Sequence, residues 1–367
     1  MRAVYELNFI PNFGHMRKGI VFYKLIFYIV MLYMCSGCTV MKNGKQMRGI
    51  FIRGDKWYYD GVVINRGAAA EGLLMNVRMV NAVFEDRSRQ ALEMEEKFDP
   101  ETNADAFISL IPEYVNYGVN AFTISLQGGD PGYEGAINSA FNADGTLRKN
   151  YLERVERIIR ACERQDVVVN LSCFYQRQYA HFSALSGKES IKNAIKNTVK
   201  WIAEKRFSNV ILEISNEYQH GGYKNWPDGD WLMSEKGQLE LIRLAKQYNP
   251  GLLVSTSGLG NGELHDSLME AADFILIHFN ITPIDNYSSK IGKLKKYGKP
   301  VVCNEDDKKG ASGARALKQA VINGCGWGYM NYTTNQSFPF VFKGSSDDIK
   351  VYRMFSKATT PGNQFTE

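Results

Sequence analysis

The stretch 189–215, ESIKNAIKNTVKWIAEKRFSNVILEIS, decides the fold class. Its first part spaces apolar residues three or four apart, which is the pattern of an amphipathic helix. Its last seven residues, NVILEIS, form an almost continuous apolar run, and a similar run, VVVNLSCFY at 167–175, precedes the helix. Continuous apolar strands on either side of a helix are typical of a parallel sheet that is covered on its faces. The stretch therefore predicts a βαβ unit.

The same alternation of strand and helix recurs along most of the chain. Apolar strand candidates lie at 73–83, 120–126, 167–175, 209–215, 252–256, 274–279, 300–304 and 326–332. Helical patterns lie at 103–117, 148–165, 189–206, 232–248, 261–271, 286–297, 311–323 and 347–357. Eight repeats between residues 73 and 360 predict an α/β fold, a single (β/α)8 TIM barrel. An open doubly wound sheet is the alternative, but no glycine-rich phosphate loop follows the first strand.

The N-terminal segment predicts export. From Met16 the chain has a basic start (Arg17, Lys18, Lys24), an apolar stretch at 25–34, and the small residues before Cys38. This order is that of a secretory signal, and the apolar stretch is too short to span a bilayer as a helix. We expect a signal peptide at 1–37, with Met16 as the true start. Ser36-Gly37-Cys38 resembles a bacterial lipobox, which implies a lipoprotein anchored at Cys38, periplasmic or at the cell surface; an uncleaved anchor and an ordinary cleaved signal remain alternatives.

Two short segments connect this signal to the barrel. Residues 39–48 form a polar tether, and residues 49–72 alternate apolar and polar side chains around the turn signal Asp60-Gly61, which predicts a β-hairpin. No Pro/Ser-rich linker follows, so we expect one folded domain.

Charge and cysteine usage exclude some classes of function. The formal net charge is +5, but Arg2, Arg17, Lys18 and Lys24 lie in the predicted signal, which leaves little excess for a nucleic-acid-binding face. The remaining cysteines show no metal-type spacing and are expected to be buried free thiols, although a disulfide stays open. They are Cys162, Cys173, Cys303 and Cys325. We predict no metal and no cofactor.

Polar residues stand where the apolar strands end, and barrel active sites form at the carboxyl ends of the strands. They are Asn216 and Glu217 after the fourth strand, His278 on the sixth, and Asn304, Glu305 and Asp306 after the seventh. A glycosidic bond is cleaved by two carboxyl groups, of which one protonates the leaving oxygen and the other attacks the anomeric carbon, ~5–5.5 Å apart in retaining enzymes. We therefore predict that Glu217 and Glu305 form such a pair.

These strand ends resemble those of clan A glycoside hydrolases, the endoglucanase-like barrels. The segments SCFYQ, ISNEY, VSTSGLG, LIHFN and CNEDD are similar to those of secreted bacterial cellulase-like proteins, and the likeness extends from the N-terminal hairpin to the eighth strand. The resemblance implies that Glu217 is the acid/base and Glu305 the nucleophile. It also implies that Asn216 hydrogen-bonds the 2-hydroxyl of the sugar in the −1 subsite.

Three positions depart from the family pattern. The second strand offers Gln127 where the family has an arginine that supports the nucleophile, and Tyr175 follows the third strand where a histidine is common. Asn280 replaces the tyrosine that follows the strand-six histidine. The candidate substrate-binding residues are Asn216, His278, Gln127, Tyr175, Asn304, Asp306 and Trp327, with Tyr329 and Tyr332 as alternatives to Trp327 for an aromatic platform.

Several residues allow two interpretations. Glu213 should point the same way as Glu217 but deeper, as a supporting or a paired buried group. Asp306 and Asp307 are candidates for substrate binding or for capping the next helix. Trp226 and Trp231 are either sugar platforms or loop packing, and His220 has no partner at metal-ligand spacing.

The sequence thus predicts a retaining glycoside hydrolase that acts on a poly- or oligosaccharide by double displacement. A non-catalytic carbohydrate-binding protein on a degenerate barrel is the alternative, motivated by the absent strand-two arginine and strand-six tyrosine. A metal-dependent hydrolase ranks last, because ligand clusters of His and Asp are lacking.

Overall fold

A computed structural model describes residues 48–87, 98–128, 137–176 and 185–365. The predicted signal peptide, the lipidation site Cys38 and all but the last residue of the tether lie outside these ranges. Among the described residues, no helix has the length and apolar character needed to cross a membrane.

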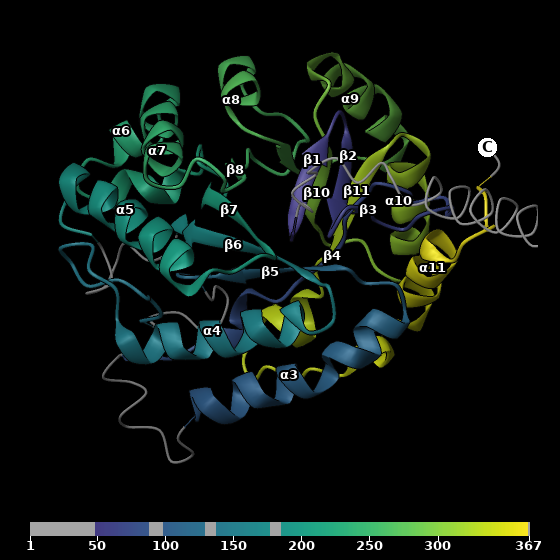
Figure 1. Ribbon diagram of the computed structural model, residues 1–367, viewed down its shortest axis with the longest axis horizontal. Helices are drawn as coiled ribbons and strands as arrows, with labels where there is room; N and C mark the ends of the chain where they lie inside the picture. The colour runs from purple at the N-terminus through teal and green to yellow at the C-terminus, as the bar shows by residue number, and fades with distance from the viewer. Residues whose placement is uncertain (1–47, 88–97, 129–136, 177–184, 366–367) are drawn as a thin grey trace, which may run out of the picture. The chain divides into compact units, whose positions relative to one another are not determined.

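Eight parallel strands form the predicted barrel (Figure 1). Their order in the sheet is β8-β7-β6-β5-β4-β11-β10-β9, and a parallel bridge between Ser257 and Leu276 joins the two ends. The strands are β4 (Met75–Arg78), β5 (Ala121–Ser125), β6 (Val168–Phe174), β7 (Val210–Ser215), β8 (Val254–Ser255), β9 (Ile275–His278), β10 (Val301–Asp306) and β11 (Cys325–Tyr329). All eight predicted strands are confirmed.

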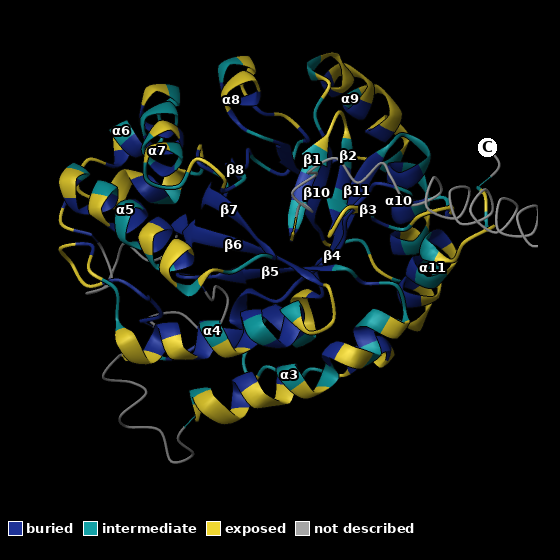
Figure 2. Ribbon diagram, in the orientation of Figure 1, coloured by how far each residue is buried: buried dark blue, intermediate teal, exposed yellow. Residues whose placement is uncertain are grey.

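Helices cover the outside of the barrel, with their inner faces buried and their outer faces exposed (Figure 2). They are α3 (Pro100–Asn116), α4 (Lys149–Glu163), α5 (Lys188–Lys205), α6 (Gly229–Leu232), α7 (Glu235–Tyr248), α8 (Asp266–Ala271), α9 (Tyr287–Leu294), α10 (Gly310–Ile322) and α11 (Ile349–Thr359). Local signals fix their ends: Asp99 caps α3 by accepting hydrogen bonds from two backbone N–H groups, and Pro100 occupies the first turn.

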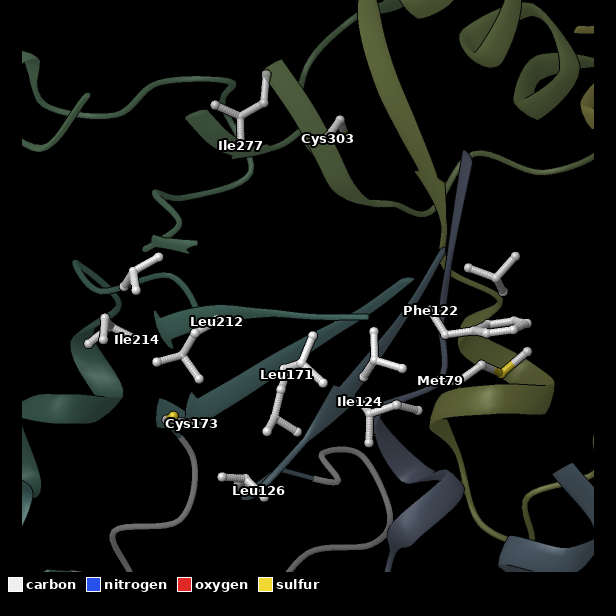
Figure 3. Packing of buried hydrophobic residues seen from close by; sticks show 14 of the residues in the cluster. Met79, Phe122, Ile124, Leu126, Leu171, Cys173, Leu212, Ile214, Ile277 and Cys303 are labelled. Atoms are coloured by element: carbon white, nitrogen blue, oxygen red, sulfur yellow. The ribbon is translucent and has the colours of Figure 1, made fainter. Parts of the chain in front are cut away.

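The hydrophobic core has two parts. The larger cluster fills the layer between strands and helices and includes Phe122, Leu171 and Leu212 (Figure 3). The smaller one lies inside the barrel, where residues at the amino ends of the strands meet a three-stranded antiparallel sheet. That sheet consists of β1 (Ile50–Arg53), β2 (Lys56–Tyr59) and β3 (Val62–Val63), and its fully buried Trp57 packs edge-on against Phe274. The predicted hairpin therefore closes the end of the barrel opposite to the candidate site.

The structure corrects two predicted boundaries. The first barrel strand ends at Arg78, and Val80–Val83 form a 3-10 helix (η1) instead of continuing the strand. The helix predicted at 261–271 begins at Asp266, where His265 provides the cap. The four cysteines within the described residues are buried free thiols, as expected.

Candidate active site

An arginine from the first barrel strand holds the two predicted site elements together. Arg78, at the end of β4, is 2% exposed; its Nη1 lies 3.0 Å from Glu305 Oε2. Its Nη2 donates a hydrogen bond of 2.9 Å to Asn216 Oδ1. The guanidinium thus contacts the predicted nucleophile and the predicted sugar-binding amide at the same time.

His278 lies between the two candidate catalytic glutamates. Its Nδ1 is 3.3 Å from Glu217 Oε1 and 3.6 Å from Glu305 Oε2, and the side chain is completely buried. One oxygen of each glutamate and a ring nitrogen of His278 all lie within 4.8 Å of one another. The side chains of Glu217 and Glu305 retain 15% and 10% exposure, so both carboxylates face an accessible space.

A shift in strand register turns Glu305 toward the barrel interior. The pairing of β10 with both neighbouring strands changes after Cys303. Regular alternation from the inward-facing Val302 would direct Glu305 outward. Instead Asn304 and Glu305 both make contacts inside the barrel, while Asp306 faces the helix layer.

Glu217 has a backbone conformation that is uncommon for a residue with a side chain. Its φ of +48° lies in the left-handed region. Ser257 Oγ accepts a hydrogen bond of 2.9 Å from Glu217 N, and Ser257 O accepts one of 3.0 Å from Tyr218 N. His220 N donates to Glu217 O at 2.7 Å. These bonds hold the turn that directs the carboxylate over the barrel mouth.

The site's charges shift the pKa of Glu217 downward. Burial alone would raise this pKa, but the hydrogen bond and charge of His278 outweigh it. The charges of His220 and Arg78 act in the same direction. Glu217 is therefore ionised more readily than an ordinary glutamate.

The pKa values of His278 and Glu213 are shifted upward, opposite to that of Glu217. Burial would lower the pKa of His278, but the carboxylates of Glu305 and Glu217 raise it above its usual value. Glu213, completely buried within the barrel, has a raised pKa because desolvation dominates.

Two amides complete the surroundings of the carboxylates. Asn280 Nδ2 donates a hydrogen bond of 2.8 Å to Glu305 Oε1, so this residue contacts the predicted nucleophile from the position where the resembled family has a tyrosine. Gln176 accepts from Asn216 Nδ2 at 3.2 Å and approaches Glu217 Oε2 at 3.5 Å. Gln176, Ser257 and Arg78 were not among the predicted site residues; the charge of Arg78 within an apolar strand was the one available signal.

Two predicted substrate-binding residues lie elsewhere. Asp306 and Trp327 are fully buried between the barrel strands and the outer helices. There Trp327 Nε1 donates a hydrogen bond of 2.8 Å to Asp306 Oδ2, and the indole packs against Phe355. Asp306 also accepts from Tyr287 and from Lys308 Nζ. Neither side chain faces the site, because the register shift turns Asp306 outward and Trp327 lies on the outward face of β11. We correct both predictions.

The other candidates lie nearer to the mouth. Asn304 contacts Glu213 beneath the two catalytic candidates. Gln127 is fully buried and links Ser139 Oγ to the backbone N–H of Tyr175, so its amide organises the loops after β5 and β6. Tyr332 follows β11 and is 49% exposed, which leaves it as the available platform among the three aromatics considered.

The tryptophans in the loop after β7 pack within the protein. Trp226 is buried and packs against Phe174 and Tyr223. Trp231 is partly buried under Lys188. The loop-packing interpretation therefore holds for Trp226.

Within the described ranges, one cluster of metal-ligand type occurs, formed by Glu217, His278 and Glu305 themselves. Arg78 places a positive charge 3.0 Å from Glu305 and so disfavours a cation there.

One family model and several solved structures match this chain. The model of the family Cellulase (glycosyl hydrolase family 5) matches residues 95–342. A comparison with curated proteins found no match.

Solved structures show the same fold. A GH5-4 broad specificity endoglucanase from Clostridium longisporum aligns with a TM-score of 0.55 at 12% identity, over 80% of this chain and 99% of that one. An endo-1,4-β-mannanase from Rhizomucor miehei aligns with a TM-score of 0.57 at 11% identity, over 85% and 99%. A glycoside hydrolase family 5 enzyme from Prevotella bryantii aligns with a TM-score of 0.51 at 12% identity, over 81% and 98%.

Proposed function

The chain belongs to glycosyl hydrolase family 5, and from this we propose that it hydrolyses its glycoside with Glu305 as nucleophile and Glu217 as acid/base. It is a glycoside hydrolase, and retention of anomeric configuration is typical of its family. The observation that carries the assignment is the approach of the two carboxylates, whose nearest oxygens lie within 4.8 Å. Retaining enzymes hold these groups ~5–5.5 Å apart, whereas inverting enzymes need room for a water between them.

In the first step Glu305 attacks the anomeric carbon while Glu217 transfers its proton to the departing glycosidic oxygen. The C–O bond to the leaving group breaks, and an ester bond forms between Glu305 and the sugar. Arg78 Nη1 and Asn280 Nδ2 each hold one oxygen of Glu305, which fixes the direction of attack. Asn216, oriented by Arg78, is placed to bind the 2-hydroxyl of the same sugar.

In the second step the Glu217 carboxylate removes a proton from water, and the resulting hydroxide attacks the anomeric carbon and releases Glu305. A low pKa of Glu217 helps the second step, in which the base must be ionised, and hinders the first step, in which the acid must be protonated. The causes that lower this pKa therefore favour turnover at acidic pH.

We propose a β-linked polysaccharide backbone of the glucan or mannan type as the substrate class. The names of the structural neighbours, an endoglucanase and an endo-1,4-β-mannanase, support this choice. The non-catalytic, carbohydrate-binding alternative was based on the absence of the strand-two arginine and the strand-six tyrosine. Arg78 and Asn280 supply contacts to Glu305 in their place, so this absence no longer favours the alternative.

The test compares Glu217→Ala and Glu305→Ala with Glu204→Gln, an exposed control on α5, on soluble glucan and mannan substrates. We expect both alanine variants to lose at least ~10³-fold in kcat, since each removes a group that acts in the transition state. Added azide should restore turnover of Glu217→Ala on an activated aryl glycoside and yield a glycosyl azide of retained configuration. Wild-type binding of glycans without turnover would favour the non-catalytic alternative.

We also propose that the protein is exported and anchored in a membrane by lipid at Cys38. The basic, apolar and small-residue order before Cys38 supports this. Labelling of cells with a fatty-acid analogue should mark the wild type but not Cys38→Ala, and the variant should leave the membrane fraction. Equal labelling of both proteins would contradict the proposal.

A further inference from the structure

Glu213 is a third carboxyl group beneath the two catalytic candidates. It lies on β7, four residues before Glu217, and is completely buried in the barrel interior. No step of the proposed reaction uses it. A buried carboxyl group is costly unless it is hydrogen-bonded, so its partners indicate what its place in the barrel achieves.

One oxygen of Glu213 connects to the backbone of Glu217 through a serine. Ser257 Oγ donates to Glu213 Oε1 at 2.6 Å and accepts from Glu217 N at 2.9 Å. A serine hydroxyl has one proton, and giving it to Glu213 directs a lone pair toward the Glu217 N–H. Glu213 therefore orients the hydroxyl that holds Glu217 in its left-handed conformation, which is strained for a residue with a side chain.

The other oxygen connects to the residue before the nucleophile. Asn304 Nδ2 donates to Glu213 Oε2 at 3.3 Å, and Asn304 O accepts from Asn76 Nδ2 at 3.1 Å. Asn304 lies within the register shift of β10 that turns Glu305 inward. Glu213 thus holds the inner side chain of that irregular segment.

We propose that Glu213 is a positioning residue that fixes both catalytic glutamates, Glu217 through Ser257 and Glu305 through Asn304. This inference rests on the proposed roles of the two glutamates and adds to them a shared support. The two connections leave Glu213 by different oxygens, so each can be removed without the other.

The test uses a pair of substrates that differ in their need for the acid. The 2,4-dinitrophenolate group of 2,4-dinitrophenyl β-cellobioside departs without protonation, whereas the phenolate of phenyl β-cellobioside must be protonated as it departs. For each substrate kcat/KM reports the step in which Glu305 attacks. A misplaced Glu217 slows the phenyl substrate alone, and a misplaced Glu305 slows both.

We expect Ser257→Ala to lose at least tenfold on the phenyl substrate and less than threefold on the dinitrophenyl substrate. Asn304→Ala should lose at least tenfold on both. Glu213→Leu should combine the losses of Ser257→Ala and Asn304→Ala. Glu213→Gln should retain much of the activity that Glu213→Leu loses. The Gln side-chain oxygen can still accept from Ser257, and its NH₂ group can donate to the Asn304 oxygen if the Asn304 amide turns over.

The matched control is Ser255→Ala, a buried serine at the end of β8 whose Oγ donates to Phe274 O at 2.7 Å and does not contact Glu217. It should leave both rates within twofold of wild type. Equal losses on both substrates for Ser257→Ala, or wild-type rates in both Glu213→Leu and Ser257→Ala, would overturn the inference.

If the wild-type protein cleaves neither cellobioside, the glucan part of the substrate proposal is contradicted, while the positioning inference is still decided by crystallography. The structure of Ser257→Ala should then show Glu217 outside the left-handed region. Retention of the present φ in that variant would overturn the inference independently of activity.

Discussion

Arg78 Nη1 lies 3.0 Å from Glu305 Oε2 although β11 separates their two strands in the sheet. The contact crosses the barrel interior above Gly326 and Gly328, which present no side chain between them. Asn76, two residues before Arg78, crosses the same gap to reach Asn304 O. The support of Glu305, the proposed nucleophile, thus comes from the first strand and not from the second, where Gln127 instead organises loops.

We predict that Arg78→Lys lowers kcat/KM by on the order of 10²-fold. A lysine ammonium is a point charge and cannot hold Glu305 and Asn216 in fixed directions at once. Steady-state kinetics on a hydrolysed glycan measures the effect. Arg78→Ala should in addition destabilise the fold by about 3–5 kcal/mol, because it leaves Glu305 without its buried partner. Wild-type kinetics in Arg78→Lys would show that the simultaneous contact of one guanidinium with Glu305 and Asn216 is unimportant for the reaction.

The pH profile should respond to His278. Glu217 must be protonated to act as acid, so kcat/KM falls as pH rises through its pKa. Burial raises that pKa and His278 lowers it more strongly, so His278→Asn removes a lowering influence. The alkaline limb of the profile should therefore move to higher pH, while kcat decreases.

His265→Asn serves as the control for this experiment, because His265 is half-exposed and pairs with Glu235 away from the site. Its profile should coincide with that of the wild type. A limb that stays in place or moves to lower pH in His278→Asn would contradict the assignment of Glu217 as the acid.

Asp306 should matter for stability and not for substrate binding. It accepts from Trp327 Nε1 at 2.8 Å and Lys308 Nζ at 3.0 Å, and also from Tyr287. Asp306→Ala leaves the partly buried Lys308 without its counter-charge and the donors of Trp327 and Tyr287 unpaired, which should cost about 3–5 kcal/mol in the free energy of unfolding. Trp327→Phe removes one hydrogen bond to a charged acceptor and should cost about 1.5–3 kcal/mol.

Denaturant unfolding measures both losses, and KM on the folded variants measures substrate contact. KM should stay within twofold of the wild-type value for Trp327→Phe. A tenfold increase in KM with unchanged stability would restore Trp327 as a sugar platform.

Four strand-end residues that the structure brings together could be predicted from sequence, but Arg78 and the contacts between them could not. Glu217, Asn216 and His278 end apolar strands, and a barrel brings such ends together whatever their distance along the chain. Glu305 was found by the same rule although strand alternation argues against it, because the register change after Cys303 depends on pairing with β9 and β11. Asp306 was misplaced by one residue for the same reason. Arg78 was overlooked because a charge near the middle of an apolar run carries no sign of the distant partner that neutralises it.

Gly328 on β11 has no side chain, and this leaves room for the contacts from β4 to β10. A Cβ at this position would lie 2.6 Å from Asn304 C and 2.7 Å from Asn304 O, backbone atoms that cannot move independently of Glu305. Gly328→Ala should therefore cost about 1–3 kcal/mol in stability, as overpacking does, and also displace the segment that carries the nucleophile. We expect kcat to fall at least tenfold in protein that remains folded by thermal unfolding. Gly292→Ala is the control, because a Cβ there meets nothing within 4 Å. If Gly328→Ala lost stability but kept kcat, the approach of the strands would matter for packing alone, and Glu305 would be held by Arg78 and Asn280 without help from the backbone beneath it.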